Sequence, residues 1–422
     1  MSIYNNNFKQ TPIGLIPIEW AAERFEKVFE LLPTNSFSRD NLTVDETENK
    51  IQNIHYGDIH AKFENEILDC STVALPYVKV EMIVKQNFVF LRDGDLIIAD
   101  ASEDYEGVGE CVEVKNVGTK KIISGLHTFL ARDNSNKTAK GFRTYIFKNP
   151  KVFIELKKIA TGISVFSISK SNLQKLLIPI PTLPEQKKIA TILSTWDAAI
   201  DNCKAIIQNL QQRNKGLAQQ LLTGKIRVKG FENTKWIEKK ADKIFKSFTD
   251  KTHNGELEIL SATQERGVIP RSMGNIDIKY DEKSLGTYKK VEIGDYVISL
   301  RSFQGGIEYS EYEGIVSPAY TILKEIIPIS KTFYKVYFKT ETFINRLNTI
   351  IYGIRDGKQI SFTDFATLNL PCPSIEEQEE IGKILLTATA GLNQYQQQLQ
   401  ILQQQKKGLM QQLLTGKVRV KI

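Results

Sequence analysis

The sequence predicts a mixed α/β (α+β) protein in which two strand-rich domains are separated by two long, repeated helices. The first observation is that residues 179–229 match residues 371–421 without a gap, and 26 of these 51 positions are identical. The second is that each copy carries an apolar stripe with heptad spacing, which is typical of coiled-coil helices. The third is that the remaining segments contain short runs of β-branched and aromatic residues bounded by Gly, Asn and Asp, which indicates strands.

These patterns divide the chain into four segments: a first domain (1–178), a first helical repeat (179–230), a second domain (231–370) and a second helical repeat (371–422). The 422 residues are enough for several hydrophobic cores. The net charge of +7 is uneven, because the domains carry −1 and +1 and the repeats carry +5 and +2. Overall charge therefore gives little indication of nucleic-acid binding.

We expect a cytoplasmic protein without a membrane contact. No apolar run approaches the roughly 20 residues of a membrane span, and the start of the chain lacks the pattern of a signal peptide. The four cysteines stand singly, so reduced thiols are expected rather than metal ligands or disulfides. His55 and His60 are close in sequence, but their spacing fits no common metal site. We therefore expect polar or structural roles for these histidines and no bound metal.

Each repeat carries signals for both ends of its helix. In each copy prolines precede a Glu-Gln dipeptide, which is Glu185-Gln186 in the first copy and Glu377-Gln378 in the second. Prolines followed by an acidic residue predict a helix start. Each copy ends in Thr-Gly-Lys, where the glycine is expected to stop the helix. The alternating Lys-x-Arg-x-Lys that follows predicts a short strand.

Between these signals, apolar residues recur with 4-3 spacing for more than four heptads. The first seam consists of Ile189, Leu193, Trp196, Ile200, Cys203, Ile207, Leu210, Asn214, Leu217 and Leu221. The second consists of Ile381, Leu385, Ala388, Leu392, Tyr395, Leu399, Leu402, Lys406, Leu409 and Leu413. Asn214 and Lys406 interrupt the seams at equivalent positions, and they either fix the register of the helices or are slips in an apolar stripe.

The two domains also repeat each other faintly. Trp20 corresponds to Trp236, and Gly94-Asp95 corresponds to Gly294-Asp295. Both domains are therefore predicted to share one fold with diverged surfaces.

The repeat resembles the specificity subunit of Type I restriction–modification enzymes. The helix starts from Pro179 to Gln186 and from Pro371 to Gln378 carry the resemblance, together with Gln-Gln-Leu-Leu-Thr-Gly-Lys at 219–225 and 411–417. The segment from Gly314 to Tyr320 is also similar to the second recognition domain of that family. The resemblance covers essentially the whole chain.

In that family the variable segments are target recognition domains, and each reads one half of a split, asymmetric site in double-stranded DNA. The resemblance implies that the repeated helices pair antiparallel, set the gap between the half-sites and dock two copies of a methyltransferase subunit. It also implies a non-catalytic chain that binds no cofactor itself. S-adenosylmethionine would come with the methyltransferase subunits, and ATP and Mg with an endonuclease/translocase subunit.

The absence of catalytic motifs agrees with a non-catalytic chain. The sequence has no Pro-Pro, which removes the usual loop of amino-methyltransferases, and no Gly-x-x-x-x-Gly-Lys-Ser/Thr phosphate loop. Two other functions stay open: a coiled-coil scaffold whose two lobes bind proteins, and a stand-alone nuclease that assembles carboxylates from the 49 acidic residues.

Candidate DNA-binding residues are long cationic or amide side chains near turns, because Arg and Gln can pair with guanine and adenine and Lys can hold phosphates. In the second domain the strongest window runs from Arg301 through Gln304 to Gly306, where the glycines allow close backbone approach. An equally simple interpretation is a turn whose arginine is only solvated. The candidates are His60, Lys62, Lys120, Lys121, Arg132, Arg143, Arg266, Arg271, Arg301, Gln304, Arg355 and Lys358.

Overall fold

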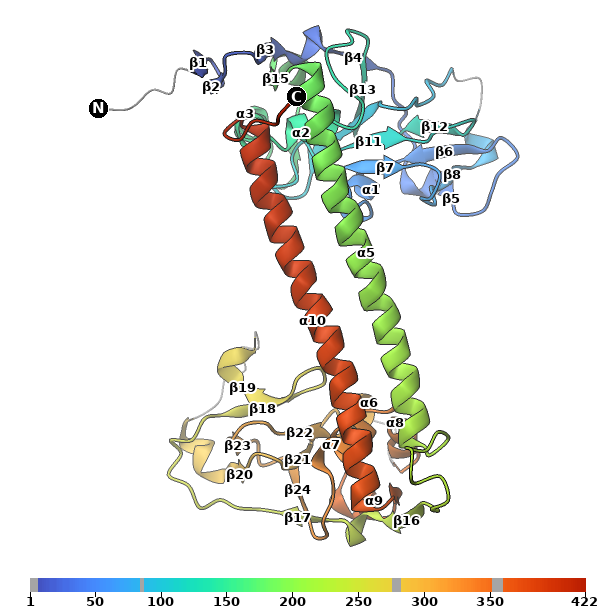
Figure 1. Ribbon diagram of the computed structural model, residues 1–422, viewed down its shortest axis with the longest axis vertical. Coiled ribbons are helices and arrows are strands. Elements are labelled where there is room, and N and C mark those ends of the chain that lie inside the picture. Colours follow the sequence, from blue (N-terminus) through green and yellow to red (C-terminus); the bar gives the residue numbers. More distant parts are fainter. Residues whose placement is uncertain (1–6, 84–86, 275–281, 351–359) are drawn as a thin grey trace. The chain divides into compact units, whose positions relative to one another are not determined.

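The chain forms two compact units, each built from one domain and the adjoining parts of both long helices (Figure 1). The first unit contains residues 1–204 and 398–422, and the second contains residues 205–397. The computed structural model describes residues 7–83, 87–274, 282–350 and 360–422.

A five-stranded sheet with the order β4-β13-β9-β11-β7 lies at the centre of the first unit (Figure 1). Its neighbours are antiparallel except for β11 and β7, which are parallel. All four residues of β9 are buried, as expected for a central strand covered on both faces. The strands are β4 (Phe29–Leu32), β13 (Thr128–Asp133), β9 (Leu96–Ala99), β11 (Cys111–Lys115) and β7 (Ile67–Asp69).

Shorter elements complete this unit. A second sheet has the order β12-β6-β8-β5, and three further strand pairs are β1-β2, β15-β3 and β10-β14. These strands are β1 (Phe8–Thr11), β2 (Gly14–Pro17), β3 (Ala21–Arg24), β5 (Leu42–Thr43), β6 (Ile51–Ile54), β8 (Tyr77–Val78), β10 (Ala101–Ser102), β12 (Lys121–Ser124), β14 (Phe166–Ser167) and β15 (Leu177–Ile180). The helices are α1 (Tyr56–Ala61), α2 (Arg143–Phe147), α3 (Pro150–Ile159) and α4 (Lys170–Lys175).

The second unit repeats the central arrangement in a smaller form. Its sheet has the order β17-β24-β21-β22, and it corresponds strand by strand to β4-β13-β9-β11. The strands are β16 (Ile237–Lys240), β17 (Phe245–Phe248), β18 (Leu260–Thr263), β19 (Gly267–Pro270), β20 (Lys289–Val291), β21 (Tyr296–Ile298), β22 (Glu308–Tyr309), β23 (Gly314–Val316), β24 (Thr321–Glu325) and β25 (Asn369–Cys372). The helices are α6 (Ser302–Gly305), α7 (Lys331–Tyr337), α8 (Glu341–Thr349) and α9 (Phe362–Ala366). The prediction that both domains share one fold is confirmed by this common strand order.

The two repeats form helices of equal length, α5 (Leu183–Leu222) and α10 (Ile375–Leu414), each of 40 residues. Both helices end before a glycine with a positive φ, Gly224 at 69° and Gly416 at 68°, as the Thr-Gly-Lys signal predicts. Within each unit the start of one helix packs beside the end of the other, so the two are antiparallel (Figure 1).

A buried carboxylate explains why a Glu-Gln dipeptide is repeated at the start of both long helices. In the first unit, Glu185 accepts a hydrogen bond of 2.8 Å from the indole of Trp20 and bonds of 2.6 and 2.9 Å from the guanidinium of Arg419. The neighbouring Gln186 accepts a 2.7 Å bond from the backbone NH of Ala139. The motif therefore joins the start of α5 to its domain and to the segment that follows α10.

The second unit contains the same arrangement around Glu377. Trp236 donates to its carboxylate at 2.9 Å, and Arg227, which follows α5, donates twice at 2.8 Å. These contacts correct one prediction from the sequence. The Lys-x-Arg-x-Lys segments after the helices are not strands, because in both copies the central arginine turns into the buried carboxylate.

Both interruptions of the apolar seam contact the facing helix. Lys406 forms ion pairs with Asp197 of α5 at 2.5 Å and with Glu66 at 2.7 Å. At the equivalent position in the other unit, Asn214 donates to the backbone carbonyl of Ala388 at 2.8 Å. Burial disfavours the charge of Lys406, but the two carboxylates raise its pKa. These contacts agree with the interpretation that the polar residues fix the register.

The seam residues differ in how deeply they are buried. Buried seam residues are Ile189, Leu193, Ile200, Cys203, Ile207, Leu221, Ile381, Leu385 and Leu413. Half-buried ones are Trp196, Asn214, Leu210, Leu217, Ala388, Leu392, Leu399, Leu402, Lys406 and Leu409. Tyr395 is exposed. Half-buried positions are expected because two helices alone leave the flanks of their seam open to water.

We expect Leu193→Ala to lower the free energy of unfolding by about 2–5 kcal/mol, since the side chain is fully buried and its removal leaves a cavity. Thermal unfolding checks this result. Leu386→Ala is the matched control, because Leu386 lies on α10 with 54% of its surface exposed. Equal shifts of the melting temperature in the two variants would contradict the assignment of Leu193 to the packed seam.

Among the residues that the structure describes, none of the helices combines the length and apolarity that a membrane crossing requires.

Candidate nucleic-acid interface

The window from Arg301 to Gly306 contains the one-turn helix α6, and packing and hydrogen bonds hold its C-terminal end in place. Gly306 has a φ of 81°, and a Cβ there would lie 2.0 Å from the carbonyl oxygen of Phe338. The ammonium of Lys339 donates to the carbonyls of Gly305 at 2.8 Å and Gln264 at 3.1 Å. The glycines therefore allow close packing of the chain against itself, whereas Arg301 is exposed on the rigid support that results.

Two arginines act electrostatically on the phenol of Tyr320 in the second unit, and a lysine bonds to the backbone of the same residue. Burial raises the pKa of Tyr320, and the positive charges of Arg271 and Arg301, which lie near enough to act on it, oppose this shift. Lys289 donates to the backbone carbonyl of Tyr320 at 2.6 Å. Arg271 is oriented by a 3.1 Å bond from its Nε to Ser261. We call Arg271, Lys289, Arg301 and Tyr320 the cationic edge.

The other candidates of the second unit lie beside this edge or outside the described residues. Gln304 is exposed on α6, next to Arg301. Arg266 is exposed at the turn between β18 and β19 and donates to the carbonyl of Met273 at 3.0 Å. Arg355 and Lys358 fall within residues 351–359, which the structure does not describe.

The matching edge of the first unit is built from histidines and a tyrosine. His60, on α1, bonds to the carbonyl of Ala101 at 2.9 Å, just after the central strand β9. His127 precedes β13 with a φ of 54° and bonds through Nδ1 to Asp100 at 3.1 Å. The ring of Tyr56 lies edge-on to both histidines, with centroids 6.1 and 5.4 Å away. His127 and Tyr56 were not candidates from the sequence, because no motif marks them.

The remaining cations of the first unit differ in how many hydrogen bonds and ion pairs they form with other residues of the chain. Lys62 and Lys120 are exposed, and each donates to a backbone carbonyl at 2.5 Å. Lys121 is exposed at the start of β12. Arg132 forms a bidentate pair with Asp95, at 2.8 and 2.6 Å, and its side chain is only 14% exposed.

Arg143 is buried within the first unit. It donates to the carbonyl of Gly94 and to the hydroxyl and carbonyl of Thr138. Because the donors of this guanidinium are used within the chain, Arg143 stabilises the fold around it. Arg132 and Arg143 therefore lie among structural contacts, whereas Arg271 and Arg301 lie at the cationic edge.

The two edges occupy equivalent places in the fold. Each is formed where the chain leaves the central strand, β9 or β21, and where it enters the neighbouring strand, β13 or β24. The second edge offers guanidinium and ammonium groups for phosphates and base edges. The first offers imidazoles and a phenol. Among the described residues, no group of three or more His, Cys, Asp or Glu side chains is placed to hold a metal ion.

Comparison with known proteins identifies the family. The family model for the Type I restriction modification DNA specificity domain matches residues 19–212 and 229–403. The MjaX specificity subunit sequence of Methanocaldococcus jannaschii is 27% identical over 98% of this chain and 97% of its own length. The EcoKI specificity subunit of Escherichia coli is 24% identical over 57% of this chain and 56% of its own length.

Solved structures share the fold. The S subunit of the type I restriction–modification system from M. genitalium is 15% identical and covers 97% of both chains with a TM-score of 0.51. A chain from a structure that addresses complex assembly and conformational transition of the type I R-M system covers 96% of this chain and 99% of its own, with 14% identity and a TM-score of 0.56. The family match favours DNA recognition over a scaffold or a nuclease. The chain belongs to the Type I restriction–modification DNA specificity family and is a non-catalytic, DNA-binding specificity subunit.

Proposed function

We propose that residues 1–178 and 231–370 are two target recognition domains, each of which reads one half of a bipartite site in double-stranded DNA. The equivalent edges of the two units support this proposal, because a shared fold presents different side chains at the same place. Guanidinium and ammonium groups at one edge and imidazole groups at the other would contact different bases. The two domains would therefore recognise different half-sites.

The repeats, residues 179–230 and 371–422, are proposed to set the gap between the half-sites and to dock two copies of a methyltransferase subunit. The continuous 40-residue helices support the first role, since each is about 60 Å long at 1.5 Å per residue. The contacts of Asn214 and Lys406 with the facing helix support a constant register between the two helices, which a fixed gap requires.

The chemistry of the complex is proposed to lie in its other subunits. The methyltransferase subunits would bring S-adenosylmethionine, and an endonuclease/translocase subunit would bring ATP hydrolysis with Mg. This chain would direct them to a sequence in cytoplasmic DNA, with no cofactor of its own.

The cationic edge is the observation that carries DNA recognition. We expect Arg271→Ala with Arg301→Ala to lower the affinity of the assembled methyltransferase complex for its target about tenfold or more, because each good base contact contributes about 1–3 kcal/mol. Fluorescence anisotropy with the target duplex, at one fixed salt concentration, measures the change.

Lys243→Ala is the control, since Lys243 is a strongly exposed cation elsewhere on the second unit. Unchanged affinity in the double variant would remove the cationic edge from the DNA interface. A loss of the same size for target and non-target duplexes would assign the edge to phosphates rather than to bases.

A further inference from the structure

The end halves of the two repeats have remained far more alike than the start halves. Between residues 208–229 and 400–421, 17 of 22 positions are identical, whereas only 9 of 29 are identical between 179–207 and 371–399. Packing accounts for identical buried residues, such as the leucines of the seam. It does not account for identical side chains on the surface.

Many identical positions of the end halves are exposed in both copies. Six of them are Gln211, Gln212, Lys215, Gln219, Gln220 and Lys225, together with the residues 192 positions further on. We call each set a helix-end surface. Most exposed residues elsewhere in the repeats have diverged, even to opposite charge, as at Lys187 and Glu379. Half-buried residues beside the surfaces differ as well, as at Ala218 and Met410.

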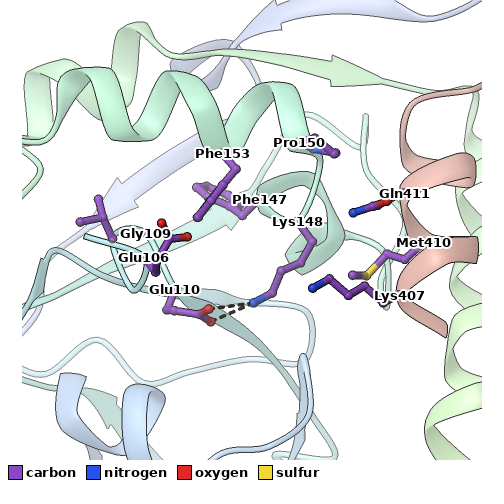
Figure 2. Close-up of a pocket in the computed structure, with 11 residues that line it drawn as sticks. Glu106, Gly109, Glu110, Phe147, Lys148, Pro150, Phe153, Lys407, Met410 and Gln411 are labelled. Carbon is purple, nitrogen blue, oxygen red and sulfur yellow. Dashed lines mark hydrogen bonds and ion pairs between the residues drawn. The ribbon is translucent and has the colours of Figure 1, made fainter. Parts of the chain in front are cut away.

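In the first unit the helix-end surface borders a groove of about 510 Å³ (Figure 2). Phe147 and Phe153 come from the domain side, and Met410 faces them from α10 together with Lys407 and Gln411 (Figure 2). This part of the groove is apolar, and Lys407 and Gln411 lie along its α10 side. Glu106 also lines the groove, where its carboxylate pairs with Lys157.

An ion pair lies inside this groove. Lys148 bonds to the carboxylate of Glu110 at 2.9 and 3.1 Å (Figure 2). Burial opposes the charge of Lys148, but Glu110 raises its pKa, so the ammonium stays charged. Since Glu110 already neutralises Lys148, Lys407 is the cation of the groove that an incoming acidic group would meet.

The second unit has a groove at the equivalent place, of about 220 Å³. Lys215, Ala218 and Gln219 line it from α5, at the positions of Lys407, Met410 and Gln411. Lys339 and Glu341 also line this groove, and the exposed carboxylate of Glu341 lies 3.9 Å from the ammonium of Lys215. Val336 and Thr340 line it from the end of α7 and the turn before α8, as the end of α2 and the start of α3 do in the first unit. The same lysine and glutamine thus flank both grooves.

We propose that the two grooves dock the same segment of the methyltransferase subunit, one copy in each unit. This inference rests on the proposed function and assigns the docking site within it. A partner that binds twice accounts for two identical helix-end surfaces in an otherwise diverged repeat. The segment carries an apolar side chain for the groove and a carboxylate for Lys407 or Lys215. The net charges of +5 and +2 on the repeats favour such an acidic segment.

The proposal is tested by counting methyltransferase subunits on this chain by native mass spectrometry. We expect Lys407→Glu or Lys215→Glu to reduce the number bound from two to one, and the double variant to bind none. Both lysines are exposed, and the side chain of Lys215 is 79% exposed, so the substitutions leave the fold intact, which thermal unfolding verifies. Lys407→Arg, which keeps the charge, retains two subunits.

Lys187→Glu is the matched control, because the other repeat already has Glu379 at that position. Two bound subunits in the double variant would overturn the docking site, and sequence-specific binding of the target by that complex would show that the recognition assignment stands. A double variant that keeps both subunits but binds all duplexes more weakly would make the lysines a phosphate-binding surface instead. A change only in self-association of the chain would assign the grooves to a second copy and also overturn the proposal.

Discussion

Exchanging residues 231–370 for the matching segment of a relative is expected to replace one half of the methylated DNA sequence and to leave the other half unchanged. The cationic edge, with Arg271, Lys289, Arg301 and Tyr320, lies wholly inside the exchanged segment. The edge that contains Tyr56, His60 and His127 lies wholly outside it. Sequencing of methylated adenines in a host that carries the chimaera measures both halves at once.

The exchange is compatible with the fold because the second unit has its own core. Backbone pairing between β16 and β25 joins the exchanged segment to the start of the second repeat, and this pairing depends little on side-chain identity. Leu221 and Ile381 from the retained helices complete the core, so the relative must have similar apolar volume there. The reciprocal exchange of residues 1–178 is the control and should change only the other half. Changes in both halves after either exchange would show that the two domains do not read DNA independently.

Lengthening both long helices by one heptad is expected to widen the unspecified gap by about three base pairs without altering the bases read. Seven residues add roughly 10.5 Å of helix at 1.5 Å per residue, and base pairs are about 3.4 Å apart. A heptad keeps the apolar seam in phase. The register contacts place position 395 level with Ile207, so the inserts belong after Ile207 and after position 394.

Methylation mapping of the lengthened protein gives the new spacing directly. Inserting only two residues in each helix is the control, because the seam would rotate off its partner and the free energy of unfolding should fall. An unchanged gap in a stable, active heptad variant would show that helix length does not set the spacing. The assignment of the recognition domains would be unaffected by that result.

The helical part of the fold could be predicted closely from the sequence. The signals for these helices are local: the heptad spacing, the Glu-Gln dipeptides at the starts and Thr-Gly-Lys at the ends. Such local signals determine where a helix begins, where it ends and which of its faces is apolar. The segments after the helices were predicted wrongly as strands. Their alternating pattern is also a local signal, but the partner of Arg227 is Glu377, 150 residues away.

The candidate interface was only partly predictable. Residue type made Arg132, Arg143 and Arg301 all candidates, and only tertiary contacts show which of them have their donors used inside the protein. Arg132 and Arg143 are drawn into Asp95 and into backbone carbonyls, where a buried guanidinium needs partners for its donors. Arg301 instead lies exposed on a segment anchored by Lys339. His127 and Tyr56 carry no sequence signal, because their proximity depends on strands that are distant in the chain.

The sequence by itself determined the domain order, the repeat, the lengths of both helices and the positions of their seams, since periodicity and end signals act within a few residues. The tertiary structure alone decided which cations have their donors used internally, which ones lie near Tyr320, and which surfaces of the repeats border a groove. These properties depend on burial and on contacts between segments up to a few hundred residues apart. The type of a residue determines what its side chain can bind. Its neighbours in space determine whether the donors of that side chain are already paired within the protein.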